Sequence, residues 1–91
     1  MTILEAVKEH MRISHSKLDN EIAASIDASM ADLSLAGIDV SDADKKPLVV
    51  TAIKLYCDAN VGYRADSEKY QNAYNGLKTT LSLAAVGDSH E

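Results

Sequence analysis

The chain has 91 residues, enough for one small domain with a hydrophobic core. Its formal net charge is −5, and its nine basic residues are scattered, with Lys45 and Lys46 the only adjacent pair. This pattern excludes the clustered positive charge that tight nucleic-acid binding requires. The single cysteine, Cys57, excludes an internal disulfide and is typical of a reducing compartment. Glu5, Lys8, Glu9 and Arg12 interrupt the N-terminal segment, and the apolar runs of the chain are short, so we expect neither a signal peptide nor a membrane segment.

The first predicted helix covers residues 2–12. Thr2 and Glu5 form the Thr-x-x-Glu pattern of a capping box, in which each side chain accepts a hydrogen bond from the other residue's backbone N–H. The apolar residues that follow fall on one face of the helix: Ile3, Leu4, Val7 and Met11.

The second predicted helix covers residues 16–36, with Ser16 and Asp19 marking its start. Its apolar residues recur at spacings of three and four, as in an amphipathic helix: Leu18, Ile22, Ile26, Met30 and Leu33. Gly37 is expected to end the helix in a left-handed conformation, with Ile38 folding back against Leu33 in a Schellman motif.

The third predicted helix ends near residue 61 and has two possible starts. Either a short helical turn forms at 42–45, or the chain enters the helix directly near Pro47, since proline suits the first helical turn. Apolar residues cover most of the circumference between Leu48 and Val61, which predicts a central helix buried on several sides. Asn60 and Gly62 are expected to stop it.

The fourth predicted helix covers residues 67–84 and is capped by Asp66 or Ser67. Its apolar face is expected to contain Tyr70, Ala73, Tyr74, Leu77, Leu81 and Ala84. Residues 85–91 are expected to form a flexible C-terminal tail. The predicted fold is therefore an all-α bundle of four helices in a single domain, residues 1–84.

The sequence offers little material for catalysis or metal binding. His10 and His15 are five residues apart, so on a helix they would point about 140° away from each other. Cys57 is expected to behave as a small buried hydrophobic residue, and Asp42 and Asp44 as solvated residues at a helix start. We therefore expect no enzymatic activity, no metal and no cofactor.

Four tyrosines lie within nineteen residues: Tyr56, Tyr63, Tyr70 and Tyr74. One interpretation is a local core around the turn between the last two helices. The other is a contact between subunits, because tyrosine combines a large apolar area with a polar tip and is enriched at interfaces. Arg64 is a candidate for ion pairing within or between subunits.

The ordered residues of this chain resemble the head–tail connector family of siphophages, whose members are also described as DNA-packaging proteins. The resemblance is carried by Ile53-Lys54-Leu55-Tyr56, Ala59-Asn60, Gly62-Tyr63, Tyr70, Tyr74, Leu77-Lys78 and Leu81-Ser82-Leu83. Upstream it is carried by Val7-Lys8, Arg12-Ile13-Ser14-His15, Leu18-Asp19, Glu21-Ile22, Asp32-Leu33 and Gly37-Ile38. It covers residues 3–83, with Val61 a departure where relatives often carry an aromatic residue.

The resemblance implies a structural virion protein that is made in the bacterial cytoplasm. Its subunits would form a ring, expected to be dodecameric, below the portal protein, and would bind the next connector or tail-terminator protein. DNA would pass through the channel without sequence-specific binding. We expect subunit or portal contacts at Tyr63, Arg64, Tyr70, Tyr74 and Val86.

Two other classes of protein remain as alternatives. A small helical adaptor or regulator would act as a monomer and bind one protein partner through an apolar groove. A helix-turn-helix DNA-binding domain would need a basic recognition helix, which none of the predicted helices provides.

Overall fold

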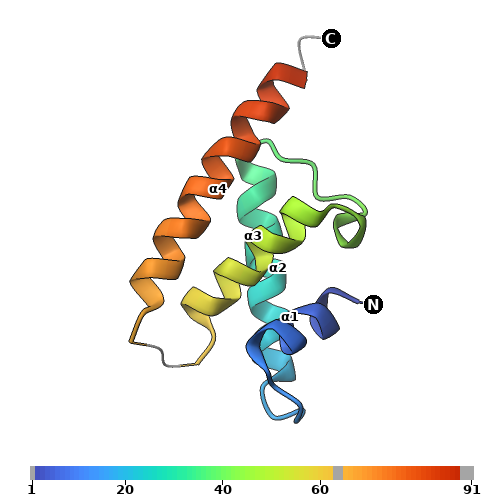
Figure 1. Ribbon diagram of the computed structural model, residues 1–91. Coiled ribbons are helices and arrows are strands. Elements are labelled where there is room, and N and C mark those ends of the chain that lie inside the picture. Colours follow the sequence, from blue (N-terminus) through green and yellow to red (C-terminus); the bar gives the residue numbers. More distant parts are fainter. Residues whose placement is uncertain (1, 63–64, 89–91) are drawn as a thin grey trace.

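The computed structural model describes residues 2–62 and 65–88, the last four by their backbone alone. Within these residues the chain forms four α-helices, one short 3₁₀ helix and no strand (Figure 1). The helices are α1 (Ile3–Met11), α2 (Asp19–Leu35), α3 (Pro47–Asn60) and α4 (Ser67–Asp88), and the 3₁₀ helix η1 (Ala43–Lys45) precedes α3. The prediction of a small all-α bundle is confirmed.

Helix α1 begins where its capping box is formed. The backbone N–H of Glu5 donates to the Thr2 hydroxyl at 3.1 Å, and the backbone N–H of Thr2 donates to the Glu5 carboxylate at 2.8 Å. These two bonds satisfy donors that a helix N-terminus otherwise leaves free, which stabilises the start of the helix. The helix ends at Met11, and Arg12 takes a left-handed conformation with φ of 59°.

Helix α2 begins three residues later than predicted. Its N-cap is Leu18, with no hydrogen bond from its side chain, so the expected cap at Ser16 is wrong. Lys8 of α1 lies 2.7 Å from the Asp19 carboxylate, so this side chain faces α1 and does not close a box with Ser16. The predicted Schellman motif at the other end is present: Ile38 N–H donates to Leu33 O and Gly37 N–H to Ser34 O, both at 3.0 Å.

Both predicted starts of the third helix occur in succession. The chain first makes the 3₁₀ turn η1, and α3 then begins with Pro47 in its first turn. Helix α3 ends at Asn60, and Gly62 follows with φ of 69°, a conformation that glycine adopts at little cost.

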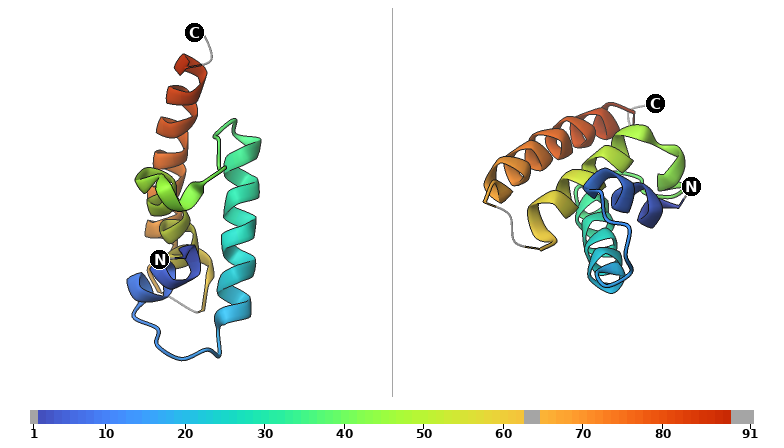
Figure 2. Two further views of the ribbon diagram at one scale, coloured as in Figure 1. Left: turned by 90° about the vertical axis from the view of Figure 1, so that its right-hand side faces the viewer. Right: turned by 60° about the horizontal axis from the view of Figure 1, so that its bottom comes forward.

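Helix α4 runs to Asp88, four residues beyond the predicted end at residue 84. Its C-terminal end extends past the end of α2 (Figure 1, and the left view of Figure 2). The predicted apolar face is only partly buried: Tyr74 is buried, Tyr70, Leu77 and Leu81 are intermediate, and the alanines at 73 and 84 are exposed. Residues 89–91 of the predicted tail lie outside the described residues.

Helix α3 is the central element of the bundle, as predicted. It packs against the other three helices and η1, and Figures 1 and 2 show it between α4 on one side and α1 and α2 on the other. The core combines apolar residues from every element: Val7, Ile22, Ile26, Leu33, Ile38, Ala43, Val49, Ala52, Ile53, Cys57, Val61 and Tyr74. Burying each large aliphatic side chain contributes about 1.5–3 kcal/mol before chain entropy is counted.

Candidate interaction surfaces

The described part of the chain holds no cluster of three or more side chains suited to bind a metal ion. No helix there combines the length and the apolar character needed to cross a membrane. Cys57 is fully buried, and this burial raises the pKa of its thiol to about 12. A thiol that stays protonated at neutral pH is a poor nucleophile, in agreement with the predicted packing role.

His10 is hydrogen-bonded to a buried acid. Its Nε2 lies 2.6 Å from Oδ2 of Asp58, and Asp58 is 3% exposed in the core of α3. A buried carboxylate is tolerated only when polar or charged groups compensate for its lost hydration. This contact therefore joins α1 to α3 and explains why an aspartate stands in the most apolar helix.

Two of the four tyrosines pack together inside the subunit. The rings of Tyr56 and Tyr74 meet edge to face, with centroids 5.2 Å apart and planes at 71°. Tyr74 is 1% exposed, so it belongs to the local core that was one of the two interpretations of the tyrosines. Tyr70 is partly exposed.

Tyr63 and Arg64 lie outside the described residues, and Val86 belongs to α4 with only its backbone described.

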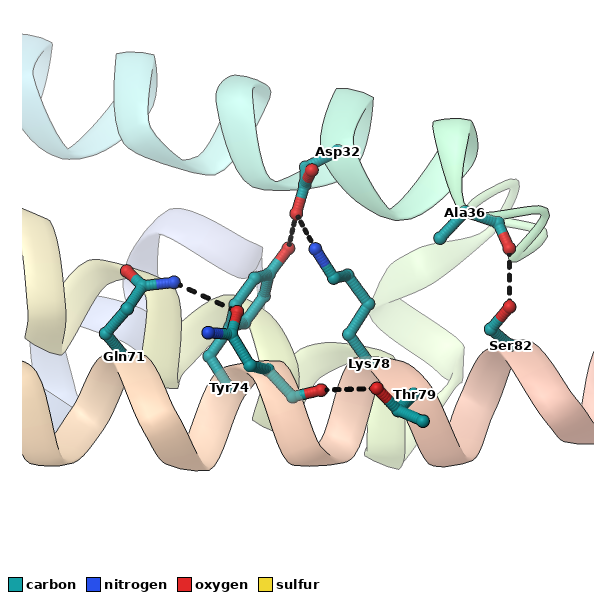
Figure 3. A network of polar contacts seen from close by, with 8 residues as sticks. Asp32, Ala36, Gln71, Tyr74, Lys78, Thr79 and Ser82 are labelled. Atoms are coloured by element: carbon teal, nitrogen blue, oxygen red, sulfur yellow. Dashed lines mark hydrogen bonds and ion pairs between the residues drawn. The ribbon is translucent and has the colours of Figure 1, made fainter.

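Helices α2 and α4 are joined by a polar network (Figure 3). The Tyr74 hydroxyl donates to Oδ2 of Asp32 at 2.6 Å, and the Lys78 ammonium donates to the same oxygen at 3.0 Å. These bonds lower the pKa of Asp32, while burial and the nearby carboxylate raise the pKa of Tyr74. One turn further on, the Ser82 hydroxyl donates to the carbonyl of Ala36 at 2.8 Å. Four side chains thus fix α4 relative to α2.

Large apolar side chains are exposed near this junction. Leu83 of α4 is 69% exposed and Leu35 of α2 is 89% exposed. Leu83 lines a shallow hollow with Ala36, Lys78, Thr79 and Ser82. Single exposed leucines are common on protein surfaces, so this feature alone identifies no partner.

A wider groove lies between the start of α1, the middle of α2 and the α2–α3 connection. Its apolar lining comes from Ile3, Ile26, Met30, Val40 and Ala43, and Thr2, Asp42 and Asp44 line it as well. A smaller hollow shares Thr2, Ile3 and Asp44 and adds Ala6 and Val50. Sequence reasoning missed this groove, because it is built from three segments distant in the chain.

A family model described as "Phage connector protein" matches residues 3–88. The chain belongs to the phage connector protein family. The match covers all four helices, and it confirms the resemblance to phage head–tail connectors drawn from residues 3–83. No curated protein and no solved structure gives a match.

Membership of this family gives the connector a structural role in a phage, at the junction of head and tail. The family is generally non-enzymatic, and its members associate with portal and tail proteins as components of the virion. The side-chain contacts described above hold the bundle together, and in the part of the chain that the structure describes the groove is open and Leu35 and Leu83 are exposed.

Proposed function

We propose that this connector forms a closed ring below the portal, where it extends the DNA channel and joins the capsid to the tail. The observation that carries the proposal is the family match over residues 3–88, which spans the whole described bundle. Ring size would follow the twelvefold symmetry of the portal, as the resemblance implies. In such a ring, two different faces of one subunit meet around a closed rotation.

The composition of the subunit supports a channel role. A net charge of −5 gives a surface that repels DNA phosphates and so lets the genome slide without binding tightly. We expect the lumen of the ring to be neutral or acidic. A strongly basic lumen in the assembled ring would contradict this expectation.

The partners of the ring are the portal on one side and the next connector or tail-terminator protein on the other. We propose that the exposed end of α4, which extends past α2, contributes to one of these contacts. Leu83 is the most exposed large apolar side chain described on α4. Tyr63, Arg64, Tyr70 and Val86 remain predicted contacts.

The function is tested by removing the gene from the phage that encodes it. We expect filled or partly emptied heads without tails, and infectious particles again when the intact gene is supplied in trans. Purified virions should contain the connector. Normal tailed particles that lack the connector would contradict the proposal and would favour a monomeric adaptor, the alternative that the apolar groove also suits.

A further inference from the structure

The two connections at the ends of α2 carry opposite charge. The α1–α2 loop, residues 12–18, contains Arg12 and Lys17 and no acidic residue, although the whole chain has a net charge of −5. Both side chains are exposed, and neither has an ion-pair partner in the described part of the chain. We call this segment the basic loop.

The α2–α3 connection is acidic where it meets the groove. The carboxylate of Asp39 already has partners within the subunit, because it accepts hydrogen bonds from Ser41 and lies 3.2 Å from the Lys46 ammonium. Asp42 and Asp44 are exposed and line the groove, and among the described residues they have no ion-pair partner. The next residue, Lys45, is not part of the lining. We call this surface the acidic groove.

The basic loop and the acidic groove cannot meet within one subunit. Helix α2 separates the two connections by 17 residues, about 25 Å of helix (Figures 1 and 2). Two copies, in contrast, can bring them together. In a head-to-tail arrangement such a contact leaves a free loop at one end and a free groove at the other, so further copies add, and they form a closed ring where the rotation between copies closes and a filament where it does not.

We propose that the acidic groove of one subunit binds the basic loop of the next subunit in the ring. This inference rests on the proposed ring and identifies the two faces that form it. Arg12 and Lys17 would lie against Asp42 and Asp44, and this pairing would set the register of the two copies. The acidic rim disfavours two other occupants, DNA and the chain's own C-terminal residues, which include Asp88 and Glu91.

Charge reversal on each face tests the pairing. The variant R12Q/K17E makes the loop acidic, and D42N/D44K makes the groove basic while asparagine suits the left-handed conformation of residue 42. At low salt, each variant alone should weaken self-association by about tenfold or more. An equimolar mixture of the two variants should restore self-association. The altered, acidic loop of one variant then meets the altered, basic groove of the other, and the unchanged basic loop meets the unchanged acidic groove. The two variants therefore alternate around the ring.

The matched control is K54Q/K69E, which makes the same change in charge on α3 and α4. Lys54 and Lys69 have no ion-pair partner among the described residues and lie outside both faces. This variant should associate like the unchanged protein. Circular dichroism of all variants verifies that the helices are retained, and sedimentation velocity measures the association. Equal weakening by the control, or no recovery in the mixture, would overturn the proposal.

Disulfide cross-linking separates this inference from the proposed ring. The variant K17C/D44C should give a ladder of covalent dimers, trimers and larger species on oxidation, whereas K17C or D44C alone should give no species beyond a dimer. The native Cys57 is buried, so it should form no disulfide in any of these variants. Rings seen by electron microscopy without a ladder of cross-linked species would contradict the proposed contact between loop and groove but not the proposed ring. Neither rings nor ladder, in the purified protein or in virions, would overturn both.

Discussion

The hydroxyl of Tyr74 donates a hydrogen bond of 2.6 Å to the carboxylate of Asp32, 42 residues earlier in the chain. This contact joins the C-terminal helix to α2, whereas the apolar packing of α4 is mainly against α3. The same carboxylate oxygen also accepts from Lys78. Asp32 therefore links two side chains of α4 to α2, in addition to the packing of α4 against α3.

Removing the Tyr74 hydroxyl should weaken this junction. We expect Tyr74→Phe to lower the free energy of unfolding by about 1–2 kcal/mol, because the bond goes to a charged acceptor and Lys78 still pairs with Asp32. Urea denaturation measures the change. Tyr56→Phe is the matched control, since no hydrogen bond of its hydroxyl is present among the described residues, and it should change stability by much less. Equal losses in the two variants would contradict the role of this bond.

The Asp32 carboxylate should make stability depend on pH. Hydrogen bonds from Tyr74 and Lys78 lower its pKa below the ordinary value of 3.8, so the folded state binds a proton less readily than the unfolded state does. The stabilisation is then fully present above the ordinary pKa and is lost as the pH falls through the lower, folded value. Asp32→Asn should be less stable than the unchanged protein at pH 6, and the difference should shrink below about pH 4. A difference that stays constant over this range would contradict this role of Asp32.

His10 should contribute to stability through Asp58. Replacing it by alanine removes a partner of a carboxylate that is 3% exposed, and we expect a loss of about 1–2 kcal/mol because His10 itself is partly exposed. The control is His15→Ala: its ring lies in the exposed α1–α2 loop and, among the described residues, accepts one local hydrogen bond, from the Lys17 backbone. Thermal unfolding of both variants at pH 7 measures the difference. A larger loss for the His15 variant would contradict the prediction.

Two glycine-to-alanine substitutions should have opposite effects. At Gly76, inside α4, an added Cβ meets no atom within 4 Å, so alanine should stabilise the helix by about 0.5–1 kcal/mol. At Gly37 the space is also open, but φ is 85°, a left-handed conformation that alanine adopts only at a cost of about 1 kcal/mol. Denaturant unfolding should therefore move in opposite directions for the two variants. A change of the same sign in both would show that the backbone conformation is not what distinguishes them.

The features that the sequence predicted well are local ones. The capping box at Thr2, the Schellman motif at Gly37 and the proline in the first turn of α3 each depend on a few adjacent residues, so their spacing alone identifies them. The start of α2 was predicted wrongly, because Asp19 lies beside Lys8 of α1 and this pairing appears only once the helices pack. Gly87 and the polar residues after it suggested an early end for α4, yet the helix includes Gly87.

The contacts that shape the candidate surfaces could not be predicted from spacing. His10 meets Asp58, and Asp32 meets Tyr74, across more than forty residues, and both pairings depend on how the helices cross. The two charged connections were visible in the sequence as a loop without acids and as a segment with three aspartates. The predicted helix over residues 16–36 already separated the two connections, but only the fold set two of the aspartates beside an apolar groove.

The measurement that tests the central claim most directly is a cryo-electron microscopy reconstruction of the head–tail vertex of the virion. We predict a closed ring of this connector between the portal and the tail, with twelve copies around a continuous DNA channel and neighbouring copies joined head to tail. A vertex without the connector, or one in which its copies do not contact each other, would contradict the claim.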